Sequence, residues 1–577
     1  MPVALATALV LVGIGLVGAI RAGLVGAAFM YDLELSRSPL ASHPPLLADA
    51  PARTTRRVAL VIVDGLRYDA SRTMPQLARW RADGVDLRAR SHYPSWSRPN
   101  YVSLLTGVPP VASGVRTNTH HTPTQLDTLM DRARAAGLRT ATAADNEAMP
   151  KLFLRPPGGV DVPAGVEIDI DAMEDPYSEA ALAAADFELV SPFDDARYAP
   201  WPGGLADAGR AELAGDYDLV VLLIGVVDQA GHAHGADSDE YRAATGVADR
   251  AVTRAVAGLD LARDTLIVVA DHGHSDSGGH GGMEPEVLDV PLVLVGAGIR
   301  AGATTSGAEL IDVAPTIAAL LGMPPPGHGL GRALTEVLTL PPAQALAQVA
   351  SDTARVARNQ AIVDDALARG DAATQANRAR RVATILGIAA VVLVAAFFAR
   401  RRGGLRLTPR VLLIGVPAFF VVYYMLIGTV GQRFSPSLLP ARGHLAWELA
   451  KYGAIGIAAH LASGWVALRG RAHFADRLAA ANGVALAGLL LTIVPAALLW
   501  AYYPPPYVRV PGPALLVMIP AVQVAVACYA TGIALTLVIE IVVFFARAVD
   551  PATRVERLER ALARTRARLP TSGDDRA

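Results

Sequence analysis

The sequence has little of what marks a disulfide-stabilised domain or a nucleic-acid-binding protein. Its 577 residues include a single cysteine, Cys528, so no disulfide can form within the chain. Charged residues make up 18%, aromatic residues 6%, and the formal net charge is −1. A net charge this close to zero argues against a general nucleic-acid binder, and we expect no nucleic-acid partner. Cysteine pairing gives no information about the compartment, so the compartment has to be inferred from membrane topology.

Long apolar segments are what the sequence has in excess. Hydrophobic residues make up 52% of the chain. About 20 apolar residues cross the ~30 Å hydrocarbon core of a bilayer. Six segments reach that length or approach it: Val3–Met30, Val382–Ala399, Val411–Val430, Trp447–Leu468, Val484–Tyr503 and Ala514–Ala546. We therefore expect an uncleaved signal anchor and five C-terminal spans, with a cleaved signal peptide as the alternative for the first segment.

Basic residues between the apolar segments predict the orientation. Arginine is concentrated in Arg400–Arg410, in Arg469–Arg477 and in the tail from Arg547. Positive loops face the cytoplasm, so alternation of six spans leaves both termini inside and the region after the first span outside. We thus expect a multi-pass protein of the cell membrane with an extracytoplasmic catalytic domain. The tail segment Thr553–Leu569 is expected to form an Arg-rich amphipathic helix that lies on anionic lipid or binds a partner.

The region between the first and second spans has an α/β pattern. Short apolar runs alternate with segments of helical spacing, which predicts a mainly parallel sheet with helices on both faces. The predicted strands are Val58–Val63, Leu219–Ile224, Leu266–Ala270 and Val290–Val295, and the clearest helices are Met74–Asp83 and Thr124–Ala136. The acidic, irregular residues Asp161–Pro202 predict a lid or a substrate-selecting insertion. The predicted parts are an anchor (1–30), a linker (31–57), the extracytoplasmic domain (58–340), a helical linker (341–381), the five-span region (382–547) and a basic cytoplasmic tail (548–577).

Aspartate and histidine residues lie at or just beyond the ends of these strands, where ligands of parallel sheets gather. Carboxylates and imidazoles are ligands for zinc or manganese. Two such ions can clamp a phosphoryl group during in-line displacement. The candidate metal ligands are Asp64, Ser97, Asp228, His232, Asp271, His272 and His280. His328 is the alternative to His280, and we expect His234 and His274 to lie behind the ligands or to face the substrate.

Ser97 is the candidate nucleophile. Pro99 suits the first turn of a helix, which would put the Ser97 hydroxyl at a helix N-terminus that favours an anion. A metal ion beside a hydroxyl lowers its pKa and makes it a nucleophile. Asn118 could donate its amide to a phosphoryl oxygen. The alternative is that Ser97 is only a helix cap and Asn118 only a turn residue.

The segment Tyr93–Gly107 resembles the nucleophile segment of the type I phosphodiesterase/nucleotide pyrophosphatase branch of the alkaline phosphatase superfamily. Asn118 falls where that branch carries its phosphate-binding Asn. The resemblance implies an alkaline-phosphatase-like fold. It also implies two groups of metal ligands: Asp64, Ser97, Asp271 and His272 for one ion, and Asp228, His232 and one further His for the other.

Within the branch, three features look more like the GPI ethanolamine phosphate transferases: the Ser-Arg-Pro core, the Gly-His280-Gly spacing and the multi-span C-terminal region. Nucleotide pyrophosphatases place the third His near where His328 stands. Sulfatases share the fold, but their Cys/Ser-x-Pro-x-x-Arg pattern would need Arg where this chain has Val102.

The function expected from the sequence is transfer of a phosphorylated lipid head group, phosphoethanolamine-like, from a membrane lipid donor to an acceptor hydroxyl. The reaction would pass through a covalent Ser97 intermediate and use two divalent ions, zinc or, as the alternative, manganese. A hydrolase of the same fold, a phosphodiesterase or phosphatase, is the first alternative. A non-catalytic lipid-handling membrane protein is the second.

Overall fold

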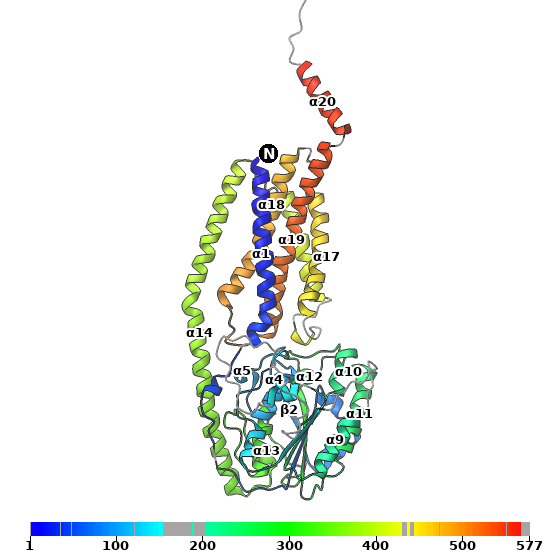
Figure 1. Ribbon diagram of the computed structural model, residues 1–577, viewed down its shortest axis with the longest axis vertical. Coiled ribbons are helices and arrows are strands. Elements are labelled where there is room, and N and C mark those ends of the chain that lie inside the picture. The colour runs from blue at the N-terminus through cyan, green and yellow to red at the C-terminus, as the bar shows by residue number, and fades with distance from the viewer. Residues whose placement is uncertain are drawn as a thin grey trace, which may run out of the picture.

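The computed structural model describes residues 2–566 except 35, 48, 121, 147, 154–186, 190–202, 430–434, 439–443, 472 and 550. Figure 1 shows two stacked parts, an α/β domain and a bundle of long helices. The predicted insertion at Asp161–Pro202 lies almost entirely outside the described residues.

The α/β domain is built on one eight-stranded sheet, in the order β4-β3-β5-β1-β6-β7-β2-β8. Neighbouring strands are parallel except where β7 pairs with β6 and with β2. This arrangement confirms the predicted mainly parallel sheet. The strands are β1 Val58–Val63, β2 Val85–Arg90, β3 Thr140–Ala144, β4 Phe187–Leu189, β5 Leu219–Ile224, β6 Thr265–Val269, β7 Asp289–Gly296 and β8 Ala308–Glu309.

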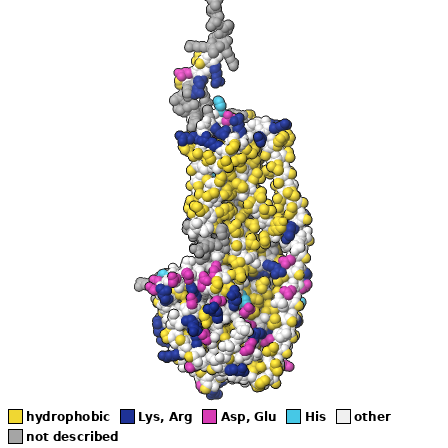
Figure 2. Space-filling model, turned by 180° about the vertical axis from the view of Figure 1, so that it is seen from behind, with side chains coloured by type: hydrophobic (Ala, Val, Ile, Leu, Met, Phe, Trp, Pro, Cys, Tyr) yellow, Lys and Arg dark blue, Asp and Glu magenta, His cyan; other side chains and the backbone are white. Residues whose placement is uncertain are grey.

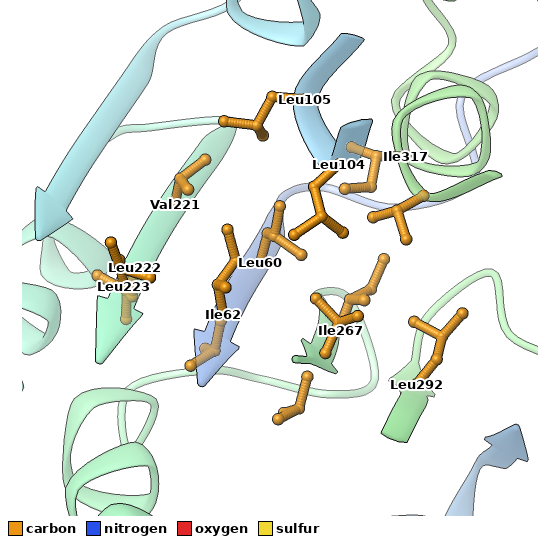
Figure 3. Packing of buried hydrophobic residues seen from close by; sticks show 14 of the residues in the cluster. Leu60, Ile62, Leu104, Leu105, Val221, Leu222, Leu223, Ile267, Leu292 and Ile317 are labelled. Carbon is orange, nitrogen blue, oxygen red and sulfur yellow. The ribbon is translucent and has the colours of Figure 1, made fainter. Parts of the chain in front are cut away.

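Helices cover both faces of this sheet, with α4 and α13 on one side and α9 and α11 on the other (Figure 1). Figure 3 shows Leu104 of α4 and Ile317 of α13 beside Leu60 of β1 in the hydrophobic core. Every residue of β1 is buried, as expected for a central strand covered on both faces. The helices of the domain are α2 Tyr68–Ser71, α3 Pro75–Asp83, α4 Ser97–Thr106, α5 Pro110–Ser113, α6 Leu129–Ala135, α7 Ala148–Phe153, α9 Gly203–Ala214, α10 Val226–His234, α11 Asp239–Ala255, α12 Pro285–Leu288 and α13 Val313–Leu321; η1 Pro39–Ser42, η2 Leu310–Asp312 and η3 Thr335–Val337 are single 3-10 turns.

The main differences from the sequence prediction are in elements with weak patterns. The helix predicted at Thr124–Ala136 begins only at Leu129, because Thr128 and Asp131 form a capping box that fixes its start. Strand β3 contains three alanines, a residue that is depleted in strands, and the sequence prediction missed it. It forms because its partner β5 supplies a parallel ladder along its whole length.

The bundle consists of α1 Pro2–Glu34, α14 Pro342–Arg401, α15 Pro409–Leu413, α16 Pro417–Thr429, α17 His444–Leu468, α18 Phe474–Tyr502 and α19 Pro513–Val549, with η4 Pro436–Leu438 between α16 and α17 and the helix α20 Pro551–Arg566 beyond it. Five helices or helix pairs among the described residues are long and apolar enough to cross a membrane: Pro2–Ala22, Pro342–Arg401, Pro409–Thr429, Phe474–Tyr502 and Pro513–Ala546. The sixth predicted span, Trp447–Leu468, lies in α17. This helix packs against α16 and α19, but Lys451 and His460 reduce its apolar character, and it is not among the five.

Both ends of the described chain lie at the end of the bundle that is remote from the α/β domain (Figure 1). Figure 2 shows Lys and Arg side chains gathered at that end, next to a broad apolar band. The protein is therefore built as a membrane protein with its basic loops on the side away from the α/β domain.

The segments predicted as linkers are part of the folded structure. In the first, Leu40 is fully buried in the core of the α/β domain, and Ser38 Oγ donates to the Ala112 carbonyl at 2.7 Å. The second is the first half of α14, a single 60-residue helix that runs from the domain to the far end of the bundle (Figure 1). Arg355 and Asn359 of α14 are buried and donate to the Gly329 carbonyl. These contacts fix the domain against the bundle.

Candidate active site

The candidate ligands lie together at one edge of the sheet. Strands β1, β5 and β6 are parallel neighbours in register, with Val63 opposite Ile224 and Ile62 opposite Val269. Their carboxyl ends therefore coincide. Asp64 follows β1 directly, Asp271 comes two residues after β6, and α10, which carries Asp228 and His232, starts two residues after β5. The shared register of three strands thus brings distant parts of the sequence to one place.

The first group of side chains surrounds Nε2 of His272. Ser97 Oγ lies 3.1 Å from this atom, and Asp64 Oδ1 and Asp271 Oδ2 each lie 3.3 Å from it. His272 Nδ1–H donates to the Gly273 carbonyl at 3.0 Å. The lone pair of the imidazole is therefore on Nε2 and points toward the two carboxylates and the hydroxyl, which is the arrangement of a metal-ligating histidine.

The carboxylates of this group have no counter-charge among the described residues. Asp64 Oδ1 and Asp271 Oδ2 are buried without a hydrogen-bond partner. Burial raises the pKa of Asp64 well above its usual value, and the nearby Asp271 and Asp228 raise it further. Burial also raises the pKa of Asp271. Buried carboxylates this close together are unfavourable unless a cation neutralises them, so the residues present fit a divalent ion.

The second group contains Asp228 and two imidazoles. Asp228 Oδ1 lies 3.4 Å from His232 Nε2 and 3.6 Å from His280 Nε2. His280 Nδ1–H donates to the Ser95 carbonyl at 2.8 Å, which again directs the Nε2 lone pair toward the group. Burial raises the pKa of Asp228, but the three neighbouring imidazoles lower it more and hold it well below the usual value. The side chain of His232 is 33% exposed, so this group is open to solvent and to a substrate.

His274 also touches Asp228, but in a different role. Its Nδ1 accepts the Gly279 N–H at 3.1 Å, so the proton is on Nε2, which donates to Asp228 Oδ1 at 2.8 Å. A nitrogen that carries a proton cannot bind a metal ion. Gly231 permits this approach, since a Cβ there would lie 2.5 Å from the His274 ring. His274 therefore lies behind Asp228 and orients it.

The other histidines singled out from the sequence lie outside both groups. His328 Nδ1 accepts the Asp127 N–H at 3.0 Å, and its Nε2–H donates to the His43 carbonyl at 2.8 Å. Both ring nitrogens are therefore used in holding two loops together, and the structure brings His280, not His328, to Asp228. His234 is exposed at the last position of α10.

Ser97 is the first residue of α4, and its side chain is mostly buried. Asn118 Oδ1 accepts the Arg98 N–H at 3.0 Å. This hydrogen bond places Asn118 beside Ser97 and leaves its NH2 group as the one that can donate to a phosphoryl oxygen.

Two supporting residues were not predicted from the sequence. Tyr101 donates its hydroxyl proton to Asp64 Oδ2. It stands four residues after Ser97, on the same face of α4, and that spacing was the signal that could have identified it. The Asn100 amide nitrogen donates to the His92 and Trp96 carbonyls, both at 3.1 Å. Asn100 thereby fixes the loop that leads into Ser97.

The candidate nucleophile segment (Tyr93–Gly107) lies against the apolar helices of the bundle. Trp96 and Tyr93 pack against an apolar cluster that includes Phe29 and Leu33 of α1 and Leu516 of α19. Helices α4, α5, α10 and α12 lie on the side of the domain that faces the bundle (Figure 1). The site is therefore close to where the bundle meets the domain.

The α/β domain is similar in sequence to several known proteins. The family model for type I phosphodiesterase/nucleotide pyrophosphatase matches residues 58–286. A 2,3-bisphosphoglycerate-independent phosphoglycerate mutase from Cereibacter sphaeroides is 29% identical over 47% of this chain and 50% of its own. Human GPI ethanolamine phosphate transferase 1 is 24% identical over 53% of this chain and 35% of its own.

The chain thus spans half or less of the length of these curated relatives. Among solved structures, murine ectonucleotide pyrophosphatase/phosphodiesterase 5 is 14% identical with a TM-score of 0.36, over 46% of this chain and 95% of that one. The alkaline phosphatase PafA is 12% identical with a TM-score of 0.37, over 50% and 99%. The family match confirms the predicted superfamily and branch, and with them the predicted class of metal-dependent phosphoesterase or phosphotransferase.

Proposed function

We propose that this chain, whose α/β domain belongs to the type I phosphodiesterase/nucleotide pyrophosphatase branch of the alkaline phosphatase superfamily, transfers a phosphorylated head group from a membrane lipid to an acceptor hydroxyl. The observation that carries the proposal is the packing of Trp96, the residue before the nucleophile, against Phe29 and Leu516 of the bundle. A nucleophile held at the end of the bundle that contacts the α/β domain would meet a membrane lipid donor at high effective concentration.

The site residues divide into two proposed ion sites. Asp64, Ser97, Asp271 and His272 would hold one ion, and Asp228, His232 and His280 the other. Three imidazoles among the ligands favour zinc, and manganese remains the alternative. Bound there, the two ions would supply charge neutralisation and a lowered pKa for the Ser97 hydroxyl.

The residues of the chain then perform a double displacement. Ser97 Oγ loses its proton to solvent and attacks the phosphorus of the donor. The bond from phosphorus to the diacylglycerol oxygen breaks, and that oxygen takes up a proton. The acceptor hydroxyl, losing its own proton to solvent, next attacks the phosphorus and releases Ser97 Oγ, which takes up a proton again. Asn118 donates its NH2 group to a phosphoryl oxygen in both steps.

Hydrolysis is the second candidate, and one observation favours it. The side chain of His232 is 33% exposed, so water can reach the proposed second ion as easily as an acceptor can. A non-catalytic role in lipid handling is disfavoured, because it gives no reason for buried carboxylates such as Asp64 and Asp271 to lie beside each other. We further propose that the α/β domain lies on the extracytoplasmic side, since the basic loops lie at the opposite end of the bundle.

The test is to give purified full-length protein a phospholipid labelled in its head group. We expect release of diacylglycerol and a gain in mass on Ser97 that persists until a hydroxyl acceptor is added. Ser97→Ala should abolish both. Ser103→Ala, which removes another buried hydroxyl of the same helix, is the matched control and should retain both. Rapid release of the free phosphorylated head group, at a rate that no acceptor changes, would show that the protein is a hydrolase and not a transferase.

A further inference from the structure

A short turn of the bundle is hydrogen-bonded to the loop that carries His280. Ser437, in the 3-10 turn between α16 and α17, is fully buried. Its Oγ accepts the Gly282 N–H at 2.8 Å and donates its own proton to Glu284 Oε2 at 2.6 Å. Ser435 donates to the other oxygen of Glu284. The turn at 435–438 therefore holds both Gly282 and Glu284.

The same loop is held from its other side by the nucleophile segment. Gly281 N–H donates to Ser95 Oγ at 2.9 Å, and Ser95 Oγ donates to the Gly282 carbonyl at 2.9 Å. His280, as described above, donates to the Ser95 carbonyl. The position of the His280 ring thus depends on a loop that is fixed between Ser95 on one side and Ser437 on the other.

The packing around Gly282 leaves no room for a side chain at this position. A Cβ on Gly282 would lie 2.5 Å from Ser437 Oγ and 2.2 Å from Glu284 Oε2, so glycine is needed for the serine to reach the backbone. The interaction is therefore a specific fit between a loop of the domain and a turn of the bundle.

A second loop of the bundle holds the other side of the site. Arg116, two residues before Asn118, donates to the carbonyls of Tyr507 and Val508 at 2.7 and 3.0 Å. Tyr93 donates its hydroxyl proton to the Pro511 carbonyl at 2.5 Å. The segments that carry Ser97, Asn118 and His280 are therefore all hydrogen-bonded to loops of the bundle.

From these contacts we propose that Ser437 is a positioning residue for the second metal site, so that the transmembrane bundle completes a site whose ligands all lie in the α/β domain. The proposal rests on the assignment of Asp228, His232 and His280 as metal ligands. Through Gly282, Ser437 keeps the His280 imidazole at the distance from Asp228 and His232 that a shared ion requires. Residues that orient ligands in this way contribute about 10- to 100-fold to metal affinity.

The experiment is a titration of metal-stripped, full-length protein with Zn²⁺, followed by calorimetry and by the metal content per chain. For Ser437→Ala we expect one of two Zn²⁺ affinities to fall by about tenfold and the other to stay unchanged. Ser437→Thr, which keeps the hydroxyl, should restore the affinity at least in part. Excess Zn²⁺ should return the turnover of Ser437→Ala to the wild-type level, which a purely structural defect would not allow.

The control is Ser463→Ala, since Ser463 lies in α17 and donates to the His460 carbonyl within the same helix. Should Ser437→Ala fail to fold, Glu284→Gln removes one of the two carboxylate acceptors and should weaken the same affinity by severalfold. Unchanged Zn²⁺ affinities in the folded variant, or equal weakening in Ser463→Ala, would overturn the role of Ser437. Wild-type protein that binds no metal would instead overturn the proposed function.

Discussion

His274 donates its Nε2–H to Asp228 Oδ1 across 2.8 Å, while its Nδ1 accepts the N–H of Gly279. The imidazole is fully buried, and both of its nitrogens are used. His274 is thus distinguished from His272 and His280, whose Nδ1–H groups donate to backbone carbonyls. Three histidines within nine residues of sequence therefore adopt two different tautomers, and the hydrogen bond on Nδ1 decides which.

The first prediction follows from that difference. His274→Ala should leave two ions bound but weaken one of them by about 10- to 100-fold, because Asp228 loses the group that orients it. His280→Ala should lose the ion altogether at ordinary metal concentrations. Metal content after dialysis at low and high Zn²⁺ separates the two variants. Complete loss in both would make His274 a ligand.

The second prediction compares His280 with His328. His280→Ala should lower the metal content from two ions toward one per chain. His328→Ala should leave the metal content unchanged and lower the melting temperature, because it removes the hydrogen bonds to Asp127 and His43; each such bond contributes about 1 kcal/mol. Elemental analysis together with thermal unfolding of the two variants gives the answer. The reverse pattern would make His328 the third imidazole ligand.

The third prediction concerns Asp145, which follows β3 at the same edge of the sheet. Its Oδ2 accepts the Gly225 N–H at 2.7 Å, and its Oδ1 has no partner among the described residues. Burial raises the pKa of Asp145 to about 7. The folded state therefore keeps the proton when the unfolded chain, with a pKa of about 3.9, has lost it. The contribution of Asp145 to stability is full below about pH 4 and is lost as the pH rises to about 7.

Asp145→Asn keeps an acceptor for Gly225 and removes the titration. At pH 5 the melting temperatures of this variant and of the wild type should be similar. At pH 8 the variant should have the higher melting temperature. Thermal unfolding at the two pH values measures this difference. Asp216→Asn is the control, since the Asp216 side chain is 99% exposed. A difference between Asp145→Asn and the wild type that does not change with pH would contradict the assignment.

The fourth prediction concerns topology. In a Cys528→Ala background, Gly258→Cys in the α/β domain should react with a membrane-impermeant thiol reagent in intact cells. Arg402 lies in a basic loop at the opposite end of the bundle. The thiol of Arg402→Cys should therefore react only after lysis. Both positions are exposed. The opposite labelling pattern would place the α/β domain in the cytoplasm.

The sequence by itself determined the central strands and which residues follow them. Continuous apolar runs such as Val58–Val63 can satisfy their backbone only in a covered sheet, so β1 and β5 begin and end where their patterns do. Because parallel strands share one carboxyl edge, Asp64 and Asp271 were expected to lie near each other from their positions alone.

The tertiary structure decided what depends on contacts between distant segments. Sequence spacing favoured His280 but left His328 as an alternative, and it could not show that His274 contacts Asp228, because both depend on hydrogen bonds of the second ring nitrogen. It also could not show that Ser437 reaches Gly282, 155 residues away. Local pattern fixes where an element begins and which of its faces is buried. The partner of a polar side chain is fixed only when the fold closes and each buried donor has to find an acceptor.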